Sequence, residues 1–153
     1  MIRLGMIHLA AALTLLGGAA QSQQVEVTPC GDGPRVDTIA EPWEQNTATY
    51  ANGEVRRALL DMVEPAGGAW KLVVISPPRD ELGLRQCRVI GANGIGFYGL
   101  DFASRRATYD SQQGLVVTFR ATRYADAAPE GEPYTLVVTI NQQTGKIGTE
   151  VRE

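Results

Sequence analysis

The chain has 153 residues and a formal net charge of −3 at neutral pH, with 44% hydrophobic and 20% charged residues. Nucleic-acid binding depends on Lys and Arg side chains gathered on one surface, so an acidic chain argues against a nucleic-acid partner. The densest basic positions are the pairs Arg56-Arg57 and Arg105-Arg106. We expect both pairs to be solvated strand or loop positions.

Residues 1–22 have the order of an export signal. Arg3 precedes an apolar run at 9–16, and small residues follow at 17–20. The run is shorter than the about 20 residues that a membrane-spanning helix needs. A buried N-terminal helix is the alternative, but such a helix needs a polar face and the run offers only Thr14.

We expect cleavage after Ala20 or Ser22, which places the protein in the periplasm or outside the cell. The remaining residues, 23–153, suffice for one hydrophobic core, and no other stretch is apolar enough to span a membrane. Cleavage also removes His8, the only histidine. A Ser-His-Asp triad, a histidine-ligated zinc site and a haem with a proximal histidine are then excluded, so we expect no metal and no cofactor.

The only two cysteines are Cys30 and Cys87. In an oxidising compartment two cysteines of one chain usually pair, and the Pro- and Gly-rich segment around Cys30 needs a tie to the domain. We predict a Cys30–Cys87 disulfide, which would also remove thiolate nucleophiles and thiolate metal ligands. Two free thiols or a bond to a second chain are the alternatives.

Residues 23–45 are predicted to form an irregular N-terminal arm, anchored by Trp43, in front of a single β-rich domain over 46–153. Proline and glycine interrupt the arm too often for a regular element of useful length. The interrupting residues are Pro29, Gly31, Gly33, Pro34 and Pro42.

The first predicted hairpin turns at Asn52-Gly53, which favours a type I′ turn with Tyr50 opposite Val55. Residues 54–63 also contain good helix formers, so a helix is the alternative there. We favour the strand because a turn, and no N-cap residue, precedes it. The β-branched run at 69–76 predicts a second strand that stops at Pro77-Pro78.

Residues 85–102 are predicted to form the central strand pair, with strands at 86–90 and 95–102 joined by a turn at 91–94. The segment 94–99 matches the Gly-x-Gly-x-x-Gly dinucleotide fingerprint, which works only between a strand and a helix. Its spacer residues favour β structure, so we interpret these glycines as turn and packing positions in a bending strand. A helical turn is possible at 103–110.

Two alternating strands follow at 115–124 and 134–140, joined by an acidic loop at 125–133. Their pattern predicts Phe119 opposite Val138, with the apolar residues on one shared face. The chain thus has seven to eight short predicted strands and no internal repeat. This composition favours a mainly β fold, either a single antiparallel β-sandwich or a strongly curved sheet, with α+β as the alternative.

The opposite face of the strand at 115–124 carries Thr118, Arg120, Thr122 and Tyr124. Such a face is often only the solvated side of a sheet. Arg and Tyr are nevertheless the residue types that contribute most to interface energy, so we predict a possible interaction face here.

Two carboxylate pairs, Asp61 with Glu64 and Asp80 with Glu81, offer the only plausible route to acid–base hydrolysis, although surface solvation explains them as well. The leading hypothesis is an exported, non-enzymatic domain that binds another envelope or secreted protein. Inhibition of a basic enzyme is one form of it, because the domain is acidic. The alternative is a small exported carboxylate-dependent hydrolase.

Overall fold

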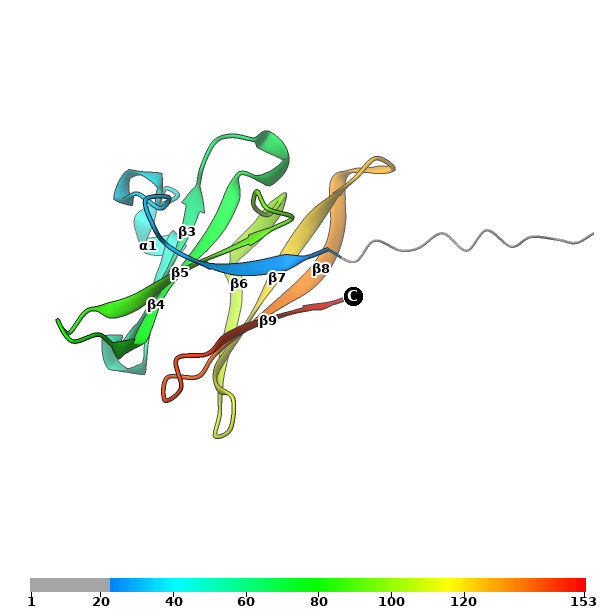
Figure 1. The fold of residues 1–153 in the computed structure, drawn as a ribbon. Coiled ribbons are helices and arrows are strands. Elements are labelled where there is room, and N and C mark those ends of the chain that lie inside the picture. The colour runs from blue at the N-terminus through cyan, green and yellow to red at the C-terminus, as the bar shows by residue number, and fades with distance from the viewer. Residues whose placement is uncertain (1–22) are drawn as a thin grey trace, which may run out of the picture.

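The computed structural model describes residues 23–153; the predicted export signal, residues 1–22, lies outside the described part. The described residues form nine strands in two antiparallel sheets (Figure 1). The first sheet contains β1 (Val25–Pro29), β2 (Thr47–Tyr50), β3 (Val55–Asp61), β4 (Trp70–Arg79) and β5 (Arg85–Ala92). The second contains β6 (Gly99–Asp110), β7 (Gly114–Ala125), β8 (Ala128–Ile140) and β9 (Ile147–Arg152).

The strand orders are β1-β5-β4-β3-β2 and β6-β7-β8-β9. The helical elements are short: α1 (Trp43–Asn46) and the 3₁₀ turns η1 (Val36–Thr38), η2 (Ala51–Gly53) and η3 (Ala66–Gly68). None of the helices in the described part is long and apolar enough to cross a membrane. The mainly β, antiparallel prediction is confirmed.

A single hydrophobic core joins the inner faces of the two sheets. Alternate residues of each strand point inward, and full burial of one large apolar side chain contributes about 1.5–3 kcal/mol. The first sheet contributes Val55, Leu59, Leu72, Val74 and Ile90, and the second contributes Phe102, Phe119, Leu136, Val138 and Ile140. At one side β1 lies beside β9, where the Thr149 hydroxyl donates to the Val25 carbonyl at 3.5 Å (Figure 1).

The predicted central strand pair is wrong, because β5 and β6 belong to different sheets. The chain crosses between the sheets after Ala92 and makes an isolated pairing of Phe97 with Trp70, whose carbonyl accepts the Phe97 N–H at 2.7 Å. A Cβ on Gly96 would lie 2.7 Å from the Trp70 carbonyl oxygen, so the crossing requires glycine. β6 begins only at Gly99, so the strand predicted over 95–102 is wrong for residues 95–98, where Gly96 lies in the crossing; a strand and not a helix follows the glycines of 94–99.

The first hairpin has the predicted pairing of Tyr50 with Val55, and 55–61 is a strand. The type I′ turn is wrong, because four residues, 51–54, connect the strands. Ala51 joins Asn52 in the left-handed region, with φ of 52° and 55°, and the wider loop follows from this conformation.

β4 and β6 extend beyond their predicted ends. β4 passes through Pro77-Pro78 to Arg79, with a register shift between Ser76 and Arg79. Proline is tolerated there because the bulge interrupts the strand ladder, so no backbone N–H donor is needed at that position. Residues 103–110 are part of β6 and contain no helical turn.

The prediction of an irregular arm over 23–45 does not hold for residues 25–29, which form β1 and pair with β5. Trp43 does not anchor the segment, since it is 42% exposed. The buried residue is Ala40, whose N–H donates to the Leu59 carbonyl at 2.9 Å.

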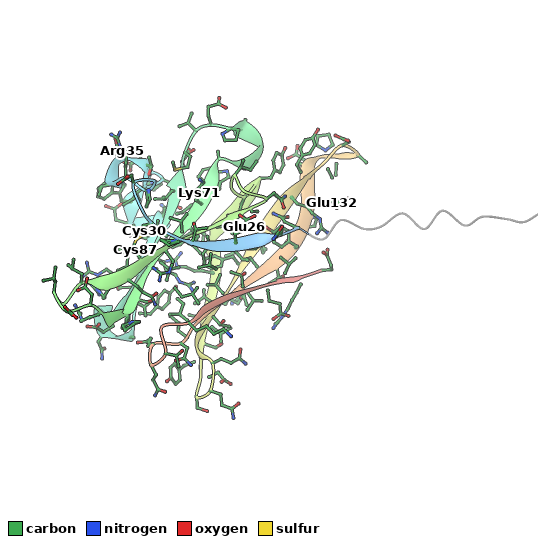
Figure 2. All side chains as sticks on the ribbon, in the orientation of Figure 1. Glu26, Cys30, Arg35, Lys71, Cys87 and Glu132 are labelled. Carbon is green, nitrogen blue, oxygen red and sulfur yellow. A yellow bond between two sulfur atoms is a disulfide. The ribbon has the colours of Figure 1, made fainter. Side chains whose placement is uncertain are left out.

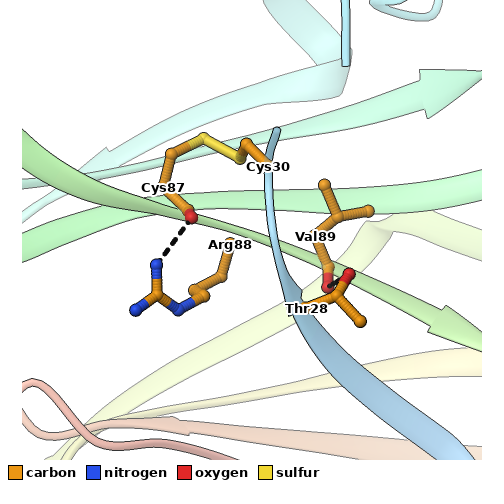
Figure 3. Close-up of a disulfide and its surroundings, with 5 residues drawn as sticks. All are labelled: Thr28, Cys30, Cys87, Arg88 and Val89. Carbon is orange, nitrogen blue, oxygen red and sulfur yellow. Dashed lines mark hydrogen bonds between the residues drawn. A yellow bond between two sulfur atoms is a disulfide. The ribbon is translucent and has the colours of Figure 1, made fainter. Parts of the chain in front are cut away.

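The predicted cysteine pair lies where β1 ends against β5 (Figure 3). The Cα atoms of Cys30 and Cys87 are 5.4 Å apart, and the Cys30 N–H donates to the Cys87 carbonyl at 3.2 Å. The Thr28 hydroxyl donates to the Val89 carbonyl at 3.4 Å on the same strand pair. A disulfide at this place is compatible with an oxidising, exported compartment.

The β7–β8 register differs from the predicted one by two residues. Phe119 faces Leu136, and Val117 faces Val138. Because side chains alternate with a period of two, this shift leaves Val117, Phe119 and Val138 on the predicted inner face. Phe119 is buried and Arg120 is exposed, which retains the outer face that the sequence pattern predicts.

Candidate functional site

The outer face of the second sheet brings the predicted interaction residues together. Thr118, Arg120 and Thr122 alternate along β7 with buried residues, and Tyr124 follows near the end of the strand. The Arg120 side chain is 80% exposed and Tyr124 is 63% exposed. These residues lie at the surface of the described part and are accessible to a partner.

A large bulge in β6 shapes this face. Between the pairs Asp101–Arg120 and Arg106–Thr118, four residues of β6 face the single residue Phe119. The Ser104 hydroxyl holds the bulge, because it donates to the Asp101 carbonyl at 2.6 Å and accepts the Arg120 N–H at 2.8 Å. The Ser104 hydroxyl thereby supplies the hydrogen-bond partner that the Arg120 N–H loses from the β6–β7 ladder because of the extra residues.

An ion pair fixes Arg120 across the same bulge. Its Nη2 lies 2.7 Å from Oδ2 of Asp101, and Oδ1 of Asp101 accepts the Ser104 N–H at 3.1 Å. Exposed ion pairs contribute about 0–1 kcal/mol to stability. The pair therefore orients the Arg120 side chain more than it stabilises the fold.

Arg105 is held at the edge of the bulge by neutral groups. Its guanidinium carbon lies 4.7 Å from the centre of the Phe102 ring. Nη1 donates to the Phe102 carbonyl at 3.0 Å and to the Gln45 carbonyl of α1 at 3.5 Å. The Arg105 guanidinium therefore has no carboxylate partner among residues 23–153.

These residues surround a cavity of about 480 Å³, which we call the bulge pocket. Its polar lining residues are Ser104, Arg105, Arg106, Thr118, Arg120 and Thr135. Guanidinium and hydroxyl groups dominate this lining, and it contains no carboxylate. A more apolar cavity of about 750 Å³ lies next to it and shares Arg120.

At the end of β7, Tyr98 and Tyr124 pack edge to face, with ring centres 5.7 Å apart. The Tyr98 hydroxyl donates to the Pro129 carbonyl at 2.7 Å, and the Tyr124 hydroxyl donates to the Asp126 carboxylate at 2.8 Å. This hydrogen bond raises the pKa of Tyr124, so the phenol stays neutral at physiological pH. The predicted loop over 125–133 is wrong, since β8 already begins at Ala128.

Arg57 is the main residue that the sequence analysis misplaced. Predicted to be solvated, it is 2% exposed and points between the sheets, 5.4 Å from the Phe119 ring centre and 5.8 Å from that of Tyr50. None of its three side-chain nitrogens has a hydrogen-bond partner in the part of the chain that is described. The alternation of Val55, Arg57 and Leu59 would have placed it inward, but composition alone predicts arginine to be exposed.

Burial lowers the pKa of Arg57 to about 10, because a low-dielectric interior disfavours the charged form. The side chain therefore remains charged at neutral pH. The aromatic faces offset part of its desolvation cost.

The aspartate of each carboxylate pair caps a turn. Oδ1 of Asp61 accepts the Val63 N–H at 2.9 Å, and Oδ1 of Asp80 accepts the N–H groups of Leu82 and Leu84 at 2.9 Å. Neither pair lines the bulge pocket or the more apolar cavity beside it. Among residues 23–153, no three Cys, Asp or Glu side chains gather closely enough to hold a metal ion. The geometry gives no support to the hydrolase alternative.

Comparison with protein-family models, with curated protein sequences and with solved structures gave no match for this chain. Any function must therefore be argued from the geometry of the two sheets and their surfaces.

Proposed function

We propose that the protein is an exported, non-enzymatic binding domain that contacts another envelope or secreted protein through the outer face of β6, β7 and β8. The observation that carries the proposal is the arrangement of Arg120 and Tyr124 on one exposed face that is hollowed by the β6 bulge. Side chains of these two types contribute disproportionately to interface energy.

The rigidity of this face supports the same proposal. Ser104 and Asp101 hold the bulge, and Tyr98 and Tyr124 are fixed by hydrogen bonds to neighbouring residues. Binding then orders few side chains that were free before, which reduces the entropy lost on association. A preorganised face is what a binding domain requires.

Two observations favour export. The sequence of residues 1–22 has the order of a signal peptide, and the Cys30–Cys87 pair lies at disulfide distance. Either a periplasmic or a secreted location fits both observations.

Charge bears on the kind of partner. The net charge of −3 favours long-range attraction to a basic protein, such as an enzyme that the domain inhibits. The bulge pocket, in contrast, presents arginines at short range, so the group that occupies it is anionic. Long-range steering and the local contact act at different distances and are compatible.

The proposal is tested with the double variant Arg120→Ala/Tyr124→Ala and a matched control, Arg56→Ala/Tyr109→Ala. The control removes one exposed arginine and one exposed tyrosine outside the proposed face. The exported protein is used to capture partners from an envelope extract, and the affinity for the captured partner is then measured. We expect the control to bind like the unaltered protein and the double variant to bind at least about thirtyfold more weakly.

Thermal unfolding of both variants checks that folding is intact. Equal capture by a folded double variant and by its control would contradict the proposed face.

A further inference from the structure

The charges of the bulge pocket are only partly balanced by the chain itself. Arg120 is paired with Asp101 at 2.7 Å, whereas the hydrogen bonds of Arg105 go to the carbonyl oxygens of Phe102 and Gln45. Arg106 is exposed and pairs with Thr118 through its backbone, and its guanidinium makes neither a hydrogen bond nor an ion pair with the described residues. The pocket therefore holds two guanidinium groups without a counter-ion.

Hydroxyl donors complete the lining. Thr118 lies on β7 and Thr135 on the neighbouring strand β8, and both line the pocket. Neither hydroxyl forms a hydrogen bond with any residue from 23 to 153. Each is available to donate to an oxygen of a bound ligand.

We propose that the bulge pocket binds the phosphoryl group of a small phosphate monoester. Such a group carries a charge of about −1.5 to −2 at neutral pH and three acceptor oxygens, which matches two uncompensated guanidiniums and two free hydroxyls. A single carboxylate would leave one guanidinium unbalanced. The pocket volume of about 480 Å³ lies in the range of small-molecule sites.

The inference rests on the proposed function in one respect, that the outer face of the second sheet is the binding surface. The ligand is either a free small molecule or the headgroup of a lipid, and both present the same chemistry to the arginines.

The test is a calorimetric titration of the exported protein with inorganic phosphate at low ionic strength, with acetate as the second anion. The variant Arg106→Gln removes an exposed guanidinium that makes no contact needed for folding, and Arg56→Gln is its matched control on the first sheet. We expect saturable phosphate binding that is about tenfold tighter than acetate binding. Arg106→Gln should weaken the affinity for phosphate about tenfold, and Arg56→Gln should leave it unchanged.

Absence of saturable phosphate binding would overturn the inference. So would an equal loss in both variants, or acetate binding as strong as that of phosphate.

Two further arms identify the source of the phosphoryl group. Binding of glycerol phosphate in solution indicates a free small molecule. Binding only to phosphatidylcholine vesicles that contain phosphatidic acid, with loss in Arg106→Gln, indicates a headgroup. Either result supports the phosphoryl site. Absence of binding in both arms contradicts it.

The outcome is separable from that of the protein-binding test. If phosphate does not bind but Arg120→Ala/Tyr124→Ala abolishes partner capture, only the phosphoryl site is wrong. If phosphate binds and the face variants leave capture unchanged, the protein-binding proposal is wrong.

Discussion

Arg57 carries a positive charge into the space between the two sheets. The lowering of the Arg57 pKa to about 10 corresponds to roughly 3 kcal/mol against the charged form. Removing one member of a buried ion pair is usually costly, because the other charge is left unpaired. Arg57 has no hydrogen-bonding partner among residues 23–153, so its replacement leaves no such group behind. The contacts with Tyr50 and Phe119 are made to ring faces, which an apolar side chain of similar length can also cover.

We therefore expect Arg57→Met to stabilise the protein by about 1–4 kcal/mol in urea unfolding at neutral pH. The exposed neighbour provides the control, since Arg56→Met should change stability by less than about 0.5 kcal/mol.

The same variant has a predicted pH dependence. A cation whose folded-state pKa is lowered destabilises the fold at all pH values below about 10, and the penalty declines as the pH rises through 10 towards the higher pKa of the unfolded chain. The stability difference between Arg57→Met and the unaltered protein should thus shrink above pH 10. A destabilised Arg57→Met at neutral pH would show that the arginine makes a contact that this account lacks.

The β6 bulge is the structural element that creates the pocket, and Ser104 is the residue that maintains it. Loss of its hydroxyl leaves the Arg120 N–H without an acceptor and the Asp101 carbonyl without a donor. An unsatisfied, partly buried backbone group costs about 1–3 kcal/mol. We expect Ser104→Ala to destabilise the fold by about 1–2 kcal/mol and to weaken phosphate binding as well.

Ser111 lies exposed in the β6–β7 turn and provides the matched control. Chemical denaturation of Ser104→Ala and Ser111→Ala measures the difference. Identical midpoints would show that the Ser104 hydroxyl does not hold the bulge.

The disulfide is the element that ties β1 to the first sheet. Cys30 and Cys87 are 57 residues apart in sequence, and the chain-entropy argument gives at most about 4 kcal/mol for a loop of this length. Cys30→Ser/Cys87→Ser should therefore lower the free energy of unfolding by up to about 4 kcal/mol.

A reducing agent should produce the same loss in the unaltered protein and none in the double variant. The mass of the oxidised protein should also be lower by two hydrogens. Unfolding midpoints that reductant does not move would argue against the bond.

Local patterns predicted the strands 55–61 and 70–76 and the inner face of β7 and β8, because each depends on residue type and on a period of two. Pairing between elements was less predictable. The glycine-rich link after Ala92 is compatible both with a hairpin and with a crossing between sheets, and packing against Trp70 decides between them. The bulge depends on tertiary hydrogen bonds of Ser104, which no local pattern shows.

At the scale of the molecule, the two sheets differ in what they expose. The first sheet carries the disulfide and the side chains of Glu26 and Lys71 (Figure 2). Glu132 lies on β8 of the second sheet. Arg123 of β7 ties this end of the second sheet together through ion pairs with Glu132 at 3.1 Å and with Glu153 at 2.6 Å. The proposed binding face therefore lies on the sheet that the disulfide does not constrain directly.

Hydroxyl-radical footprinting, with and without the captured partner, tests the central claim that the outer face of the second sheet is the binding surface. Tyr124 and Tyr109 are similarly exposed, at 63% and 69%, so both should react readily in the free protein. We expect the partner to protect Tyr124 and to leave Tyr109 reactive. Protection of Tyr109 or of Trp43, with Tyr124 still reactive, would contradict it.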